Sequence, residues 1–135
     1  MNRNVVTAKP DTPIKEAAAI MSKNRIGSLI VTDNDKIVGI VTERNIMDII
    51  AEGIETNQIT LADIMKKDVI TIDPSKTIED AVDIMVENKI KKLPVVDGDK
   101  LIGIITASDI AVLQPKLIAN IAKLISLQIP GYRGG

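Results

Sequence analysis

The apolar residues in the first half of the chain follow two spacings, and these predict its secondary structure. Apolar side chains three and four positions apart predict helices at residues 14–24 and 43–52. Short continuous apolar runs predict buried strands at residues 5–8, 28–32 and 37–41. The predicted order of elements is therefore strand, helix, strand, strand, helix.

The same order of elements occurs again in the second half of the chain. Apolar runs predict strands at residues 69–72, 93–96 and 101–105, and helical spacing predicts helices at residues 78–88 and from residue 107. A shift of about 64 positions superposes the two halves without a gap. Identical pairs occur in helices, strands and turns: Val5/Val69, Thr7/Thr71, Pro10/Pro74, Ile14/Ile78, Ala17/Ala81, Met21/Met85, Asn24/Asn88, Leu29/Leu93, Val31/Val95, Asp33/Asp97, Lys36/Lys100, Gly39/Gly103 and Thr42/Thr106. Such agreement indicates an internal duplication.

Further segments lie between and after the repeats. Residues 55–60 form a polar linker. Thr60 and Asp63 then predict a capping box for a short helix at residues 60–65, a lead-in that the first repeat lacks. Another amphipathic helix is predicted at residues 115–129. The predicted domains are the first repeat (1–58), the second repeat (59–114), and a C-terminal helix with a tail (115–135).

The strands of each repeat are apolar on both faces, and such strands need cover on both sides. Neither repeat alone buries enough apolar surface to be comfortably stable. We therefore expect the repeats to pack face to face about a pseudo-twofold axis, with two symmetry-related clefts. The predicted fold class is α/β (α+β), built from two β-α-β-β-α repeats.

Composition argues against several functional classes. The 135 residues are 45% hydrophobic and 26% charged with a net charge of −1, which favours a globular protein that binds neither nucleic acid nor a membrane surface. No apolar run reaches membrane-spanning length. The N-terminus has no signal-peptide apolar region, so we expect a cytoplasmic protein. Aromatic residues are 1% of the chain, which disfavours base stacking on single-stranded nucleic acid.

Catalysis is also disfavoured by the residue types present. The chain has no cysteine and no histidine, which removes the thiolate nucleophile, the thiolate metal ligand and the commonest general base. No serine has an evident base beside it, and no pair of carboxylates is placed for acid–base chemistry. We therefore predict a binding protein, with an enzyme as the disfavoured alternative.

One polar motif follows the last predicted strand of each repeat. Thr106 precedes Asp109 by three positions, so both side chains can lie on one face of a first helical turn. Together with unpaired N–H groups at the helix start, they could recognise a sugar phosphate. The alternative is an N-cap with an acidic first turn. Thr42 and Asn45 occupy the equivalent positions.

The duplicated unit resembles the cystathionine-β-synthase (CBS) domain pair, also called a Bateman module, over residues 4–114. The matching words are Ile64-Met65, Val69-Ile-Thr-Ile-Asp-Pro, Thr77-Ile78, Lys91-Lys-Leu-Pro-Val-Val-Asp and Gly103-Ile-Ile-Thr-Ala-Ser-Asp. The resemblance implies a regulatory sensor of AMP, ADP or ATP, with no other cofactor. Some family members instead respond to S-adenosylmethionine, NAD or magnesium.

The resemblance also implies which residues bind the nucleotide. In the better site, Asp109 would hold the ribose and Thr106, with Ser108 beside it, the phosphate. Lys92 and Lys91 would also reach the phosphate. The resemblance places adenine against aliphatic side chains and backbone of the other repeat, here Val6, Ile26, Gly27 and Ser28.

The second implied site departs from the family pattern. Asn45 replaces the aspartate, Gly27 stands where a basic residue is common, and Ile30 replaces a proline. An amide makes a weaker hydrogen bond than a carboxylate, although Arg44 could contact phosphate. We expect weaker binding there, or a preference for another phosphate count. The remaining residues of this candidate site are Thr42, Ile70, Ile90 and Lys91.

Local alternatives accompany these assignments. Thr12 is a candidate N-cap of the helix at residues 14–24, and a local pair with Arg44 is the alternative explanation of Glu43. The acidic residues at 33–35 and 97–99 fit hairpin turns better than a calcium loop. Apolar helices at residues 46–51 and 111–124 predict a disc-like homodimer. The regulated partner is unknown, and a dimerisation scaffold without nucleotide is the alternative.

Overall fold

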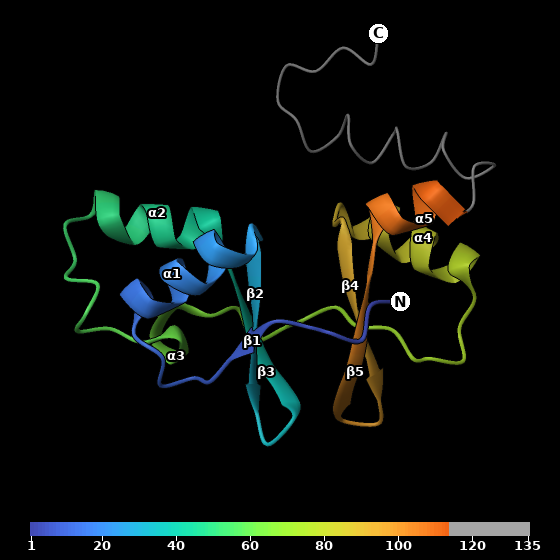
Figure 1. Cartoon of the computed structure of the whole chain (residues 1–135), viewed down its shortest axis with the longest axis horizontal. Coiled ribbons are helices and arrows are strands. Elements are labelled where there is room, and N and C mark those ends of the chain that lie inside the picture. Colours follow the sequence, from blue (N-terminus) through green and yellow to red (C-terminus); the bar gives the residue numbers. More distant parts are fainter. Residues whose placement is uncertain (114–135) are drawn as a thin grey trace, which may run out of the picture. The chain divides into compact units, whose positions relative to one another are not determined.

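The computed structural model describes residues 1–113, and Figure 1 labels their helices and strands. The chain divides into two compact units. The first-repeat unit comprises Val6–Val69, and the second-repeat unit comprises Met1–Val5 together with the chain from Ile70 onward. The predicted helix at residues 115–129 and the tail lie outside the described residues.

The first-repeat unit is a small sheet with helices on one face (Figure 1). Its strand order is β1-β2-β3, with β1 (Thr7–Ala8) parallel to β2 (Ser28–Asp33) and β3 (Lys36–Thr42) antiparallel to β2. Its helices are α1 (Ile14–Asn24), α2 (Glu43–Ala51) and the short α3 (Leu61–Ile64). The predicted elements of the first repeat are thus present with small shifts of their ends.

The core of this unit lies between α1 and the sheet. Ile14, Ala17 and Met21 form the buried stripe of α1. They cluster with apolar side chains of β2, β3, α2 and α3, which include Leu29, Val31, Val41, Ile46 and Leu61. Because these side chains are nearly or fully excluded from water, they provide the main hydrophobic stabilisation of the unit.

The second-repeat unit repeats the helix–hairpin–helix arrangement. It contains α4 (Ile78–Asn88), β4 (Lys92–Asp97), β5 (Lys100–Thr106) and α5 (Ala107–Leu113). Its core is built from Ile72, Ala81, Val82, Met85, Leu93, Val95, Ala107 and Ile110. The β4–β5 register matches that of β2–β3, since Leu93 pairs with Ile105 as Leu29 pairs with Val41. The duplication seen in the sequence is therefore a duplication of structure.

Tight turns close both hairpins, as the sequence predicts. Asn34 and Asp35 have positive φ angles of 53° and 65°, and Gly98 has a φ of 63°. Asn, Asp and Gly tolerate this left-handed conformation better than other residues. Among residues 1–113, no group of three or more acidic side chains is placed to hold a metal ion. The left-handed turn residues at 34–35 and 98 agree with the hairpin explanation of the neighbouring acidic residues.

One predicted strand is reduced to a single bridge. The sequence predicts a strand at residues 69–72, but only Ile72 pairs, in parallel with Val95. In the first repeat, both Thr7 and Ala8 pair with β2. Pro94 takes the place of Ile30 and has no N–H to donate, so the pairing cannot extend to Thr71. The strand prediction was therefore too long for the second repeat.

The segment before each repeat pairs with the other repeat. Lys66 bridges to Ile40 of β3, and Asn2 bridges to Ile104 of β5 in the same antiparallel manner. Asn2 occupies the position in the first repeat that Lys66 occupies in the second. The described residues before β1 contain no helix like α3, as the sequence predicts, but residues 1–2 make the same bridge that Lys66 makes.

Helix caps were predicted with mixed success. The N–H and Oγ1 of Thr60 both donate to the Asp63 carboxylate, at 2.8 and 3.2 Å, which confirms the predicted capping pair. The Thr12 prediction was wrong, since α1 has Pro13 at its N-cap and no side-chain cap hydrogen bond. The Thr12 carbonyl instead accepts the N–H of Leu61 at 2.9 Å.

Candidate functional site

In the second-repeat unit, the predicted polar residues meet at one end of the β4–β5 hairpin. Lys92 begins β4 and pairs in register with Thr106, which ends β5. The N–H of Ala107 donates to the carbonyl of Lys91 at 2.8 Å. This bond holds the start of α5 beside the start of β4. Two lysines therefore lie at the same end of the hairpin as the first turn of α5, which contains Ser108 and Asp109.

Thr106 and Asp109 fit both interpretations of their motif. Thr106 Oγ1 accepts the N–H of Asp109 at 3.1 Å, which is an N-cap hydrogen bond. The Asp109 side chain is exposed, and its carboxylate has no hydrogen-bond or ion-pair partner among the described residues. The hydroxyl therefore serves the helix, while both carboxylate oxygens can accept from a ligand.

Two apolar residues of the predicted site, Ile70 and Ile90, connect this end of the hairpin to the core of the second-repeat unit. Ile70 and Ile90 are half-buried and pack against the core cluster that contains Met85 and Leu93. Lys89 ends α4 in a left-handed conformation, and the N–H of the next residue, Ile90, donates to the carbonyl of Met85 at 2.9 Å. These contacts fix the path of the chain from the end of α4 to Lys91 and to Lys92, the first residue of β4.

The first-repeat unit has the same backbone arrangement at its equivalent end. Ser28 begins β2 and pairs with Thr42, which ends β3. The N–H of Glu43 donates to the carbonyl of Gly27 at 2.9 Å, as Ala107 does to Lys91. The backbone is thus duplicated, while the side chains at these positions differ.

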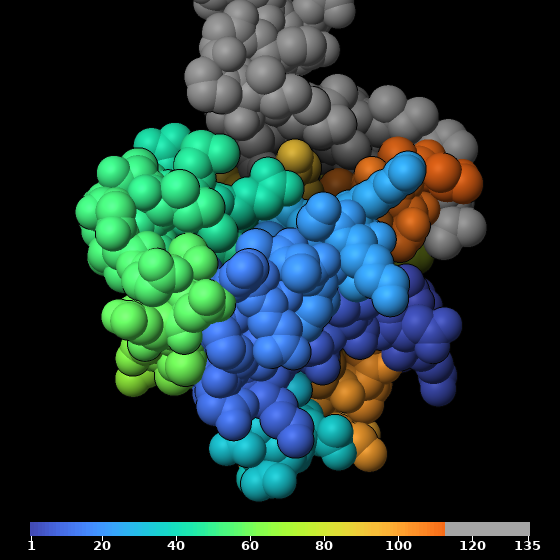
Figure 2. Space-filling model, turned by 60° about the vertical axis from the view of Figure 1, so that its left-hand side comes forward, coloured from blue at the N-terminus to red at the C-terminus, as the bar shows by residue number. Residues whose placement is uncertain are grey.

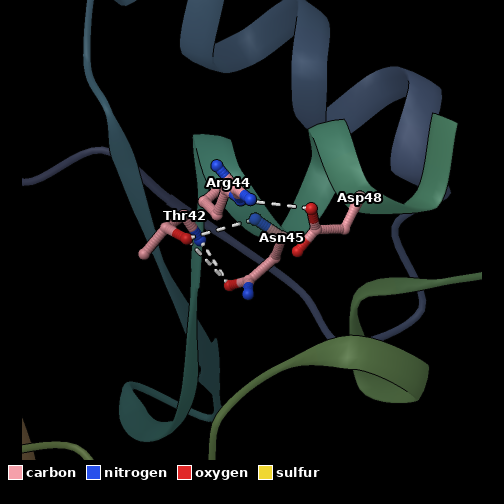
Figure 3. A network of polar contacts seen from close by, with 4 residues as sticks. All are labelled: Thr42, Arg44, Asn45 and Asp48. Atoms are coloured by element: carbon pink, nitrogen blue, oxygen red, sulfur yellow. Dashed lines mark hydrogen bonds and ion pairs between the residues drawn. The ribbon is translucent and has the colours of Figure 1, made fainter. Parts of the chain in front are cut away.

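Asn45 is engaged in its own helix cap, unlike Asp109 (Figure 3). Its Oδ1 accepts the N–H of Thr42 at 2.9 Å and the Thr42 hydroxyl at 3.0 Å. In return, Thr42 Oγ1 accepts the N–H of Asn45 at 3.3 Å. This reciprocal capping box occupies the amide oxygen that the resemblance would assign to a ribose.

Arg44 pairs along α2 instead of with its neighbour. Its Nε donates to Asp48 Oδ1 at 3.1 Å, an i,i+4 pair in which the Arg44 side chain is 81% exposed (Figure 3). The local pair expected between Glu43 and Arg44 was therefore wrong. Residues four apart share a helix face, whereas adjacent residues diverge, which explains the preference for Asp48.

Glu43 lies at this end of the first-repeat unit, although the sequence analysis did not place it among the site residues. Its carboxylate lies over Gly27, with Oε1 2.9 Å from the position that a Cβ on Gly27 would occupy. The carboxylate has no ion-pair partner among residues 1–113. The signal was present in the repeat alignment, where Glu43 aligns with Ala107 and Gly27 with Lys91.

Val6 and Ile26, predicted to contact adenine, are half-buried against the core of the first-repeat unit. Ile26 also lines a groove of about 490 Å³ between α1 and α2. Its other lining residues are Ala18, Met21, Ser22, Arg25, Glu43, Ile46, Met47 and Ile50. Figure 2 shows α1 in blue beside α2 in green on this face. The prediction that residues of both repeats share each binding cleft stays a prediction.

Comparison with known proteins gives the family. The sequence model of the CBS domain matches residues 1–52 and 61–115, which is both repeats. The chain belongs to the CBS-domain family. The CBS assignment and the mixed α/β fold predicted from the sequence are thus confirmed, and the chain carries a tandem CBS pair, an arrangement typical of regulatory modules.

Individual relatives agree with this assignment. An uncharacterized protein of Methanopyrus kandleri is 38% identical over 122 residues, which are 88% of this chain and 62% of that protein. The inosine-5′-monophosphate dehydrogenase of Thermoplasma acidophilum is 40% identical over 113 residues, 83% of this chain but 22% of the enzyme. A putative signal-transduction protein with CBS domains from Burkholderia ambifaria has a TM-score of 0.73 at 30% identity, with 84% of this chain and 85% of that chain covered.

The CBS pair thus spans less than two thirds of the length of these two sequence relatives. Within the described part of the chain, no helix is both long and apolar enough to cross a membrane.

Proposed function

We propose that this CBS pair is a regulatory module that binds an adenosine nucleotide (AMP, ADP or ATP) through its second repeat. The observation that carries the proposal is the exposed Asp109 carboxylate, which has no partner among the described residues and follows a capped helix start. Lys91 and Lys92 lie at the same end of the hairpin. A ligand with hydroxyl donors and an anionic group complements this set.

Each residue of the second repeat would bind the part of the nucleotide that its side-chain chemistry suits. The Asp109 carboxylate can accept hydrogen bonds from both hydroxyls of a ribose, and a charged acceptor makes these bonds stronger than neutral ones. The hydroxyls of Thr106 and Ser108 can donate to phosphate oxygens. Lys91 and Lys92 supply positive charge for the phosphate.

The module acts without catalysis in this proposal. The chain has no histidine or cysteine, and Asp109 has no neighbouring group arranged to take or give a proton among the described residues. Binding energy would instead shift the equilibrium between conformations that a regulated partner distinguishes. A dimerisation scaffold without nucleotide is the competing function, and S-adenosylmethionine or NAD are competing ligands.

A second copy of the chain is the proposed occupant of the groove between α1 and α2. Met47 and Ile50 on its rim are 61% and 60% exposed. Most of the remaining lining is apolar, from Ala18, Met21, Ile26 and Ile46, so a two-fold related copy could offer a matching apolar face. The other helix predicted to join a homodimer, residues 111–124, lies largely outside the described residues.

A thermal-shift panel tests the proposed function. AMP, ADP, ATP, S-adenosylmethionine and NAD are each added at millimolar concentration, with an external dye because the chain has one tyrosine and no tryptophan. A ligand at about 100 times its Kd stabilises the folded state by about 2.7 kcal/mol, a shift of several degrees for a chain of this size. A rise with an adenosine nucleotide that Asp109→Ala removes supports the proposal. No rise with any of the five ligands contradicts it and favours the scaffold.

A further inference from the structure

We propose that Glu43 excludes anionic ligands from the first repeat, so that the nucleotide phosphate is accepted by the second repeat alone. Glu43 is thus a specificity-determining residue that makes the duplicated chain functionally asymmetric. The inference rests on the proposed nucleotide binding. It adds which repeat binds the anionic phosphate and which residue determines that choice.

The position of the carboxylate carries this inference. Glu43 Oε1 lies 2.9 Å from where a Gly27 Cβ would be, and its Cδ lies 3.4 Å from the same point. The N–H of Glu43 is hydrogen-bonded to the carbonyl of Gly27 at 2.9 Å. Backbone and side chain of Glu43 therefore both lie against the residue at which the chain enters β2. A negative charge covers the place where the second repeat carries Lys91.

The two residues in contact, Gly27 and Glu43, are both replaced at the equivalent positions of the second repeat. In the second repeat, Lys91 replaces Gly27 and Ala107 replaces Glu43. The backbone hydrogen bond between the two positions is retained, at 2.8 Å. One repeat thus presents a cation and a methyl group where the other presents no side chain and a carboxylate. The backbone geometry is shared, so the difference in charge at these two positions comes from the side chains alone.

Arg44 does not cancel the charge of Glu43. Its Nε is held by Asp48 at 3.1 Å, four residues further along α2. Among the described residues, no ion pair or side-chain hydrogen bond involves the Glu43 carboxylate. A phosphate brought to the start of α2 would therefore meet an uncompensated carboxylate, and like charges at close range repel even near a protein surface.

The N-cap of α2 also disfavours nucleotide binding at the first repeat. The Asn45 amide oxygen already accepts two hydrogen bonds from Thr42. A ribose could bind it only by competing with these bonds. The first repeat therefore combines a closed cap with a repelling charge, whereas the second combines an open carboxylate at Asp109 with Lys91.

Backbone-amide NMR on the full chain tests the inference, with sodium pyrophosphate and then AMP as probes. In the unsubstituted chain, saturable shifts are expected at Lys91 and Ala107 and not at Gly27 and Glu43. The double variant Gly27→Lys/Glu43→Ala copies the second repeat into the first. It should gain saturable pyrophosphate shifts at positions 27 and 43, with an apparent affinity at least about tenfold above that of the unsubstituted chain there.

The control and the contrary outcomes are distinct. Glu16→Ala removes an exposed carboxylate from the first turn of α1 and should leave the pattern unchanged. Pyrophosphate shifts at both positions 27 and 91 of the unsubstituted chain, or no gain in a folded double variant, overturn the assignment of Glu43. If the expected pyrophosphate shifts occur but AMP, ADP and ATP cause no shifts, only the proposed nucleotide function is contradicted.

Discussion

Lys66 and Ile40 are joined by two backbone hydrogen bonds of 2.9 Å, each residue donating one and accepting the other. Asn2 and Ile104 are joined in the same way, also at 2.9 Å in both directions. In each case the segment that precedes one repeat pairs with the third strand of the other. The segments share one more feature, a methionine packed over a glycine of the receiving strand, Met65 on Gly39 and Met1 on Gly103.

Substitution of Gly39 tests the importance of this contact. A Cβ at position 39 would lie 2.5, 2.6 and 2.9 Å from Sδ, Cγ and Cβ of Met65. Because the Met65 Cβ cannot rotate away, Gly39→Ala should lower the free energy of unfolding by about 1–3 kcal/mol. In the absence of this contact, alanine in a strand would be expected to stabilise.

Urea denaturation of the full chain measures this effect. Met65→Ala removes two of the three close atoms, so the double variant should be more stable than the sum of the single effects by at least about 0.5 kcal/mol. Strictly additive effects, or a Gly39→Ala chain as stable as the parent, would show that the methionine does not fill the glycine position.

A pH effect is expected from the cap of α4. The carboxylate of Asp80 accepts the backbone N–H of Thr77 at 3.1 Å, which lowers the pKa of Asp80 below 3.8 in the folded state. The folded state therefore binds fewer protons than the unfolded state as the pH falls through 3.8. The stabilisation is fully present well above pH 3.8 and is lost as the pH falls through the lowered folded-state pKa.

Asp80→Asn should therefore flatten the dependence of unfolding free energy on pH between neutral and acidic solution, because an amide oxygen accepts the same bond without titrating. Urea denaturation at a series of pH values measures the slope. Asp83→Asn, which changes an exposed carboxylate of the same helix, serves as the control. Equal slopes for the Asp80 and Asp83 variants would contradict the assignment. Asp73, whose pKa is also lowered, by hydrogen bonds from Ser75, maintains part of the slope in both.

Local sequence patterns predicted most elements of this fold. The predicted helices at residues 14–24 and 78–88 coincide with α1 and α4, because the spacing of buried residues such as Ala17 and Ala81 is visible in the sequence. The strand at residues 69–72 failed because one backbone N–H is missing at Pro94, on the neighbouring strand. Pairing partners of this kind are not contained in the local pattern.

The candidate site was only partly predictable for the same reason. The motif placed Thr106 and Asp109, and the repeat placed Thr42 and Asn45. That Asn45 closes its own cap while the Asp109 carboxylate stays open depends on side-chain hydrogen bonds that the residue types alone do not determine. The contact of Glu43 with Gly27 joins residues 16 positions apart, and it appears only when the hairpin is folded.

The apolar groove between α1 and α2 leads to a prediction about assembly. Ile50 is 60% exposed on its rim, so Ile50→Glu would bury a charge in the proposed homodimer interface. Analytical ultracentrifugation should show a dimer for the parent chain and a monomer for this variant. Asn57→Glu adds the same charge to the exposed linker and should leave the dimer intact. A parent chain that is monomeric, or an Ile50→Glu chain that stays dimeric, contradicts the proposed interface.

The central claim is that the Asp109 carboxylate holds the nucleotide, and titration calorimetry tests it most directly. The measurement compares AMP and ATP binding to the parent chain, Asp109→Asn, Asp109→Ala and the surface control Glu87→Gln. Hydrogen bonds to a charged acceptor contribute about 1.5–3 kcal/mol, so Asp109→Ala should weaken binding by about tenfold to a hundredfold. Asp109→Asn should lie between Asp109→Ala and the parent, and Glu87→Gln should match the parent. Equal affinities of the parent and Asp109→Ala for every nucleotide that binds would contradict the claim.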